Sequence, residues 1–175
     1  LMAIALRKSG HLANYITDEH YHDLGKLMFA FSVFWAYIAF SQYFIIWYAN
    51  LPEETIYFTF RTANGWQWFG IALVITHFIM PFALLLRQGV KRKVAMLRIA
   101  AVVILVSHFI DIIWIVMPAV SKVVKHEGIL FGWQEFTGVI FFAGIFCILT
   151  ARNYMKRSAV AVNDPLVHES LEYSS

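Results

Sequence analysis

The sequence has little charge and almost no cysteine. Only 14% of its 175 residues are charged, against about 25% in a typical soluble domain, whereas 60% are hydrophobic. This composition excludes a soluble globular protein. The single cysteine, Cys147, excludes an internal disulfide, a four-thiolate zinc or iron-sulfur site and the two-cysteine attachment of a c-type haem. Any redox cofactor must therefore be held non-covalently or belong to a partner.

The apolar residues fall into four runs that are long enough to cross a membrane, which takes about 20 residues per helix. The runs are residues 27–51, 66–86, 94–117 and 131–151. We predict an all-α membrane protein whose residues 27–151 form a four-helix transmembrane bundle. The chain opens at Leu1, and we expect a fragment in which residues 1–26 are the end of a preceding helix and a cytoplasmic interfacial segment. Residues 152–175 are polar and are expected to form a cytoplasmic tail.

Basic residues and tryptophans indicate how these runs are oriented. Eleven of the 14 Lys and Arg residues lie at the termini or in the second connection, and such residues accumulate on the cytoplasmic side. Both ends of the chain are therefore expected to be cytoplasmic. Topology also explains the net charge of +3, so we exclude nucleic-acid binding. Five tryptophans lie near the opposite, outer ends of the runs, as the membrane interface favours: Trp47, Trp66, Trp68, Trp114 and Trp133.

The first connection contains the start signal of a short helix. Pro52 suits the first helical position, and Glu53 and Glu54 suit the positive end of a helix dipole. We expect a surface helix that runs from Pro52 to about Arg61 on the outer face.

Ionisable residues occur at membrane depth. With a rise of 1.5 Å per residue, His77 lies about 16 Å inside Trp66, and His108 lies about 15 Å inside Pro118. Asp111 follows His108 by one helical turn, so both side chains project from one face of their helix. A carboxylate at this depth costs about 2.5 to 3.5 kcal/mol unless it finds a partner or water. We therefore expect Asp111 to meet His77, His108 or a wet cavity.

Gln42 and Glu135 extend this polar set to the first and fourth runs. Gln42 lies about 12 Å from Asn50, and Glu135 lies four residues from Phe131, so all four helices are expected to contribute to one polar cluster in the outer half of the membrane. Intramembrane ionisable groups are functional by default, which favours proton handling or ligand binding. The alternative is a hydrogen-bond network that only holds the helices together.

Proline and aromatic residues add to this interpretation. Pro81 has no amide hydrogen for the carbonyl of His77, so the helix is expected to kink and free that carbonyl. Trp114 and neighbouring phenylalanines can supply aromatic walls for a flat ligand. His20 and His22 are two residues apart, a spacing that does not suit one metal on a helix, and we interpret them with His11 and nearby acids as a solvated surface. No metal site is predicted.

Four segments of the first half carry a resemblance to a known family. They are residues 22–27, 34–37, 40–43 and 46–55, which read HDLGKL, FWAY, FSQY and IWYANLPEET. Together they resemble the second quinone-binding-type membrane subunit of bacterial alternative complex III, whose fold is similar to the NrfD/polysulfide-reductase membrane-anchor family. The match is looser, by hydropathy and polar placement, over the other three runs.

The resemblance implies a bacterial inner-membrane subunit of a quinol:electron-acceptor oxidoreductase, with this chain as the second four-helix bundle of an NrfD-like subunit. It implies other membrane subunits, an iron-sulfur subunit, multihaem cytochrome c subunits and lipids as partners. On this basis we expect His77, His108, Asp111 and Glu135 to form a proton pathway. Gln42 and Trp114 are expected to contact a quinone.

Two other functions stay open at this stage. His77 and His108 can also be read as axial ligands of a b-type haem, because they share a depth in neighbouring helices. The chain can also be a structural anchor that holds peripheral redox subunits through its outer segment.

Overall fold

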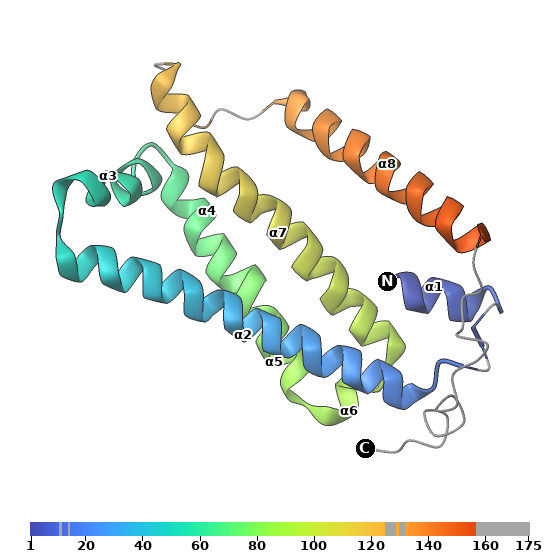
Figure 1. The fold of residues 1–175 in the computed structure, drawn as a ribbon. Helices are drawn as coiled ribbons and strands as arrows, with labels where there is room; N and C mark the ends of the chain where they lie inside the picture. Colours follow the sequence, from blue (N-terminus) through green and yellow to red (C-terminus); the bar gives the residue numbers. More distant parts are fainter. Residues whose placement is uncertain (11, 14, 125–128, 130–131, 157–175) are drawn as a thin grey trace.

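The computed structural model of the chain is all-α and has four helices that are long and apolar enough to cross a membrane (Figure 1). It describes residues 1–10, 12–13, 15–124, 129 and 132–156. The four candidate spans are α2 (Asp18–Ala49), the segment Trp66–Leu86, α7 (Val94–Val123) and α8 (Trp133–Lys156). Four spans near the expected positions are thus present, which indicates a multi-pass membrane protein.

The first span begins nine residues before the predicted start at residue 27. Thr17 precedes α2, and its backbone amide donates to Nδ1 of His20 at 3.3 Å, so a capping box starts the helix at Asp18. α2 is therefore 32 residues long. It ends at Asn50, which adopts a left-handed conformation (φ 49°) that asparagine tolerates better than most residues.

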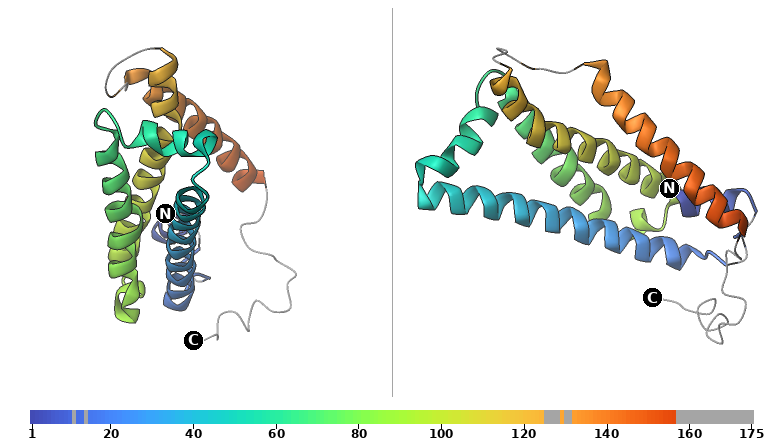
Figure 2. Two further views of the ribbon diagram at one scale, coloured as in Figure 1. Left: turned by 90° about the vertical axis from the view of Figure 1, so that its left-hand side faces the viewer. Right: turned by 45° about the horizontal axis from the view of Figure 1, so that its top comes forward.

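The short helix in the first connection is confirmed as α3 (Pro52–Arg61), with proline at its start and two acids in its first turn. α3 joins the ends of α2 and α4 (Trp66–Leu73), and we call this end of the molecule the α3 end (Figures 1 and 2). At the other end lie α1 (Met2–Lys8) and the four-residue helix α6 (Gln88–Lys91), and we call it the α6 end.

The second span contains a π-helical segment. Its elements are α4, the π helix η1 (Val74–Ile79) and α5 (Met80–Leu86). The amide of Met80 bonds the carbonyl of Ile75, five residues earlier, directly before Pro81, which has no amide hydrogen. The sequence predicted a kink at Pro81 that frees the His77 carbonyl; what the structure shows here is a change of hydrogen-bond register around His77.

Three of the four spans pack closely. α2 lies against α5, η1 and α7, and α4 also packs on α7. Two buried clusters hold them, one of Tyr21, Leu85, Leu97 and Ala100 near the α6 end, and one of Trp66, Ile113 and Met117 near the α3 end. α8 differs because none of its apolar window is buried. It faces α7 across a cavity of about 590 Å³, and the rings of Phe109 and Phe136 lie 5.8 Å apart between the two helices.

Candidate functional site

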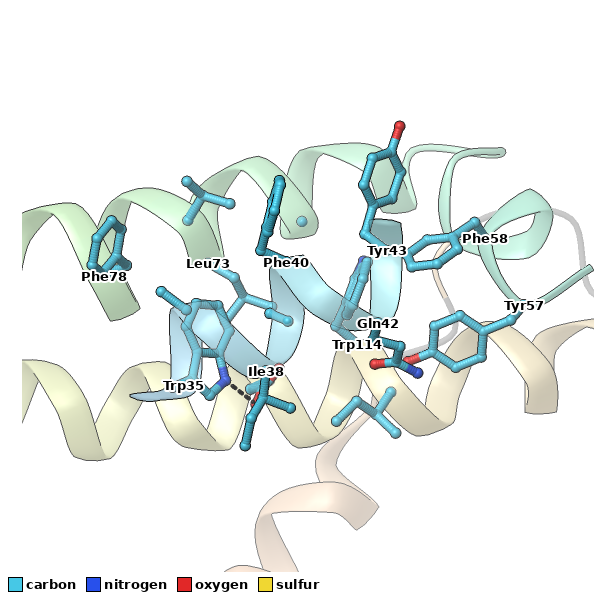
Figure 3. Close-up of a pocket in the computed structure, with 16 residues that line it drawn as sticks. Trp35, Ile38, Phe40, Gln42, Tyr43, Tyr57, Phe58, Leu73, Phe78 and Trp114 are labelled. Carbon is cyan, nitrogen blue, oxygen red and sulfur yellow. Dashed lines mark hydrogen bonds between the residues drawn. The ribbon is translucent and has the colours of Figure 1, made fainter. Parts of the chain in front are cut away.

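Asp111 lies in α7, and its carboxylate accepts a hydrogen bond from an indole on another helix. Nε1 of Trp35, on α2, donates to Oδ2 of Asp111 at 3.0 Å (dashed line in Figure 3). Asp111 is only 8% exposed, so it needs such a donor to offset the loss of water. The sequence predicted a histidine or a wet cavity as its partner; the observed donor is Trp35, and the carboxylate also lines a cavity.

Trp35 also joins Asp111 to the predicted histidines. Its ring stacks on the imidazole of His77, with centroids 4.3 Å apart and planes 18° apart. The His77 ring in turn meets the ring of His108 edge to face, at 6.1 Å and 81°. The structure therefore brings His77, His108 and Asp111 into one group, and Trp35 is the member that sequence reasoning missed.

The members of this group differ in how they are covered. His77 is 5% exposed and Ser107, on α7, is 1% exposed, whereas His108 is exposed. Nδ1 of His77 is buried and has no hydrogen-bond partner among the described residues. An imidazole nitrogen in this state can donate or accept one further hydrogen bond, which is what a proton-transfer group requires.

A cavity of about 740 Å³ adjoins this group toward the α3 end (Figure 3). Residues of α2, α3, α4, η1 and α7 form its walls, which are mostly apolar, and Gln42 and Asp111 are polar residues among them. The aromatic part of the wall consists of Trp35, Phe40, Tyr43, Tyr57, Phe58, Phe78 and Trp114. Such a cavity suits a flat, largely apolar molecule held by few polar contacts.

Trp114 forms the part of this wall that faces α4. Its indole lies beside Gly70: a Cβ atom at Gly70 would lie 3.4 Å from Cζ2, at ordinary van der Waals distance. Nε1 of Trp114 is buried and has no hydrogen-bond partner in the described part of the chain. The indole therefore offers one donor to a ligand or water.

Arg61, the last residue of α3, lies against the rings of Tyr57 and Trp114 that line the cavity. This residue was not singled out from the sequence. It is 4% exposed, and its guanidinium donates to the carbonyl oxygens of Tyr57 at 2.6 Å, Trp114 at 3.2 Å and Ile115. Burial lowers the pKa of this guanidinium from its ordinary value, although arginine stays charged at any physiological pH. The signal that could have found it is Pro118, which cannot bond the carbonyl of Trp114.

Two predicted residues are not placed in this group. Gln42 lines the cavity and is exposed, and no hydrogen bond joins it to Asp111 or to either histidine in the described chain. Glu135 belongs to α8, but its side chain lies outside the described part of the structure. The described residues therefore bring together polar groups from α2, η1 and α7, and the expected contribution of the fourth span lies outside them.

The histidines near the α6 end differ from the expected solvated surface. His22 is 3% exposed, so that interpretation is wrong for this residue. Its Nδ1 lies 3.8 Å from Oε2 of Glu19, whose Oε1 pairs with Arg92 at 2.9 Å. The reason is that the start of α2 packs against the α6 connection, with Gly25 close to Lys91. His11 lies outside the described residues.

Metal binding finds no support in the described residues, where no three His, Cys, Asp or Glu side chains come together. No model of a known protein family matches the chain, and no curated protein matches it significantly.

Proposed function

We propose that this chain is an integral membrane subunit of a bacterial quinol:electron-acceptor oxidoreductase of the alternative complex III type, and that it contributes a transmembrane proton pathway. The chain would be the second four-helix bundle of an NrfD-like subunit, in the bacterial inner membrane with both ends cytoplasmic. The observation that carries the proposal is that Trp35 joins two buried residues, because it bonds Asp111 and stacks on His77, whose Nδ1 has no hydrogen-bond partner among the described residues.

The group has the chemistry that proton transfer requires. Quinol oxidation releases protons as well as electrons, and an imidazole can accept a proton at one ring nitrogen and release one from the other. Asp111 accepts the Trp35 hydrogen bond through one oxygen, which fixes the carboxylate between the helices. In this proposal protons pass among His77, His108 and Asp111, and Glu135 continues the path toward the outer face.

A quinone headgroup fits the cavity beside this group. Its aromatic walls match a flat ring, the unpartnered Nε1 of Trp114 can donate to a carbonyl oxygen, and Gln42 supplies an amide. The cavity adjoins this group directly, because Trp35 and Asp111 belong to the group and also line the cavity. The electrons would leave to an iron-sulfur subunit and multihaem cytochrome c subunits at the outer face.

Substitution Asp111→Asn tests the proton pathway. The amide oxygen can still accept from Trp35, so the helices should assemble, but the side chain can no longer exchange a proton. In the whole complex in sealed vesicles, we expect quinol-driven proton movement to fall by about a hundredfold, the lower end of what a positioned acid or base contributes. Glu53→Gln, which removes an exposed carboxylate from α3, is the matched control. Unchanged proton movement in Asp111→Asn would remove Asp111 from the mechanism.

The contact between the two imidazole rings also favours a second candidate, a b-type haem held by His77 and His108. An absorption spectrum of the purified subunit separates the two functions, because a haem gives bands that a proton pathway does not. Replacement of His77, His108 and Asp111 together by apolar residues tests the structural-anchor alternative, for which full activity is expected.

A further inference from the structure

Arg61 is a buried cation whose hydrogen bonds in the described chain all go to main-chain carbonyl groups. Its guanidinium is bonded to carbonyl oxygens of Tyr57 on α3 and of Trp114 and Ile115 on α7. Arginine presents five N–H donors in a fixed fork, which suits several carbonyl groups at one point. No carboxylate pairs with it among the described ion pairs, so its role is not that of a surface salt bridge.

The position of Pro118 explains why one of these carbonyl groups, that of Trp114, is available. Pro118 lies inside α7, and without an amide hydrogen it cannot bond the carbonyl four residues earlier, which belongs to Trp114. A carbonyl group left without a donor within a membrane costs several kcal/mol. Nε of Arg61 supplies the missing donor to that oxygen, and its NH2 group bonds the next carbonyl, of Ile115.

The same guanidinium touches the cavity wall. Its carbon lies 3.5 Å from the ring centre of Tyr57 and 5.6 Å from that of Trp114, and both rings line the cavity. Trp114 therefore meets Arg61 through its carbonyl group and through its ring, whereas its indole nitrogen has no partner in the described chain. Ile115, the other residue of α7 bonded by Arg61, also lines the cavity.

From these contacts we propose that Arg61 is a positioning residue for the cavity: by supplying the hydrogen bond to the Trp114 carbonyl that Pro118 cannot, and a second one to Ile115, it fixes the turn of α7 that carries these two residues against α3. The cavity wall is then set by a residue of the outer connection. This assignment does not depend on which molecule the cavity binds or on proton movement.

A double-mutant cycle with Pro118 tests the inference in the full chain in detergent micelles. The first measurement is backbone amide exchange over residues 115–123, followed by mass spectrometry. We expect Arg61→Ala to speed exchange there by tenfold or more, as the loss of charged hydrogen bonds predicts, and Arg61→Lys to lie between it and the parent. Arg98→Ala, which removes an exposed arginine from α7, should leave the exchange rates unchanged.

The decisive variant is Arg61→Ala combined with Pro118→Ala. The amide that Pro118→Ala introduces can donate to the Trp114 carbonyl, so most of the protection against exchange should return. Equal loss of protection with and without Pro118 would overturn the inference. If Arg61→Ala alone does not fold, recovery of folding in the double variant supports the inference, and failure of both variants contradicts it.

A second measurement separates positioning of Trp114 from general stability. The emission of Trp114 is obtained as the difference between each variant and the same variant with Trp114→Phe. We expect Arg61→Ala to shift this emission to longer wavelength, because the indole gains contact with water, and the double variant to restore it. An unshifted emission in Arg61→Ala would show that Arg61 does not set the cavity wall. Neither measurement involves quinol, so a result that contradicts the role of Arg61 would leave the proposed function standing.

Discussion

Two neighbouring spans each contain a proline, and the structure compensates for the two prolines in different ways. At Pro81 the helix itself adjusts: η1 shifts to bonds between residues five apart, within the segment that carries His77. At Pro118 a different helix supplies the donor, because Arg61 of α3 bonds the carbonyl groups of Trp114 and Ile115. The surroundings differ as well, since Nδ1 of His77 has no hydrogen-bond partner among the described residues.

The turn at Pro118 is therefore held by hydrogen bonds, whereas the turn at Pro81 lies beside a ring nitrogen that can still form one. Around Pro118 the carbonyl groups gain charged donors, which fix the backbone. Around Pro81 the π-helical turn lies beside a buried imidazole, and π-helical turns occur frequently at functional sites. We therefore expect substitutions near Pro81 to change activity and substitutions at Pro118 to change little while Arg61 is present.

The largest effect is expected from Trp35→Phe in the region around His77. Phenylalanine retains a ring to stack on His77 but lacks the N–H group that bonds Asp111. The loss of a hydrogen bond to a charged group should lower the free energy of unfolding by about 2 kcal/mol. Denaturant unfolding in micelles measures this, with the exposed Trp47→Phe on the same helix as control. A stability equal to that of Trp47→Phe would mean that the indole bond to Asp111 contributes nothing.

Pro81→Ala is expected to have the next largest effect. It restores an amide hydrogen, so the π-helical turn can return to α-helical bonding. Because a π-helical turn holds one residue more than an α-helical turn, this change rotates the two flanking segments relative to each other by about 100°, the rotation per residue of an α-helix. His77 would then leave its place on Trp35, and we expect proton movement in vesicles to fall about tenfold. Full activity in this variant would show that the π-helical turn does not position His77.

Pro118→Ala should have the smallest effect. The new amide competes with Arg61 for the carbonyl of Trp114. The helix therefore gains a hydrogen bond to a carbonyl group that already has a donor. We expect the free energy of unfolding to change by less than about 1 kcal/mol and proton movement to stay at the parent level. An effect as large as that of Pro81→Ala would remove the distinction between the two prolines.

Patterns local to one helix were readable from the sequence. Hydropathy located the four spans, Pro52 with its two acids located α3, and the rise of a helix placed His77 and His108 at one depth, where their rings meet. Each of these depends only on residues close together in the chain or on a known rise per residue.

Contacts between helices were not readable in this way. Trp35 and Asp111 are 76 residues apart, and no periodicity indicates which indole among six reaches a given carboxylate. The burial of His22 depends on how α2 meets the α6 connection. Arg61 is an intermediate case, because the rule that linked Pro81 to His77 also links Pro118 to Trp114, but it does not say which residue donates.

The length of α2 has a consequence for how the chain sits in a bilayer. Its 32 residues extend about 48 Å, whereas the hydrocarbon layer is about 30 Å thick. Even with some tilt, the first turns of α2 must stand in the headgroup region or in water, and these turns carry His22 and Glu19. One continuous helix thus carries the buried His22 with its neighbour Glu19 near the membrane surface and, about 20 Å further along its axis, the indole that holds Asp111.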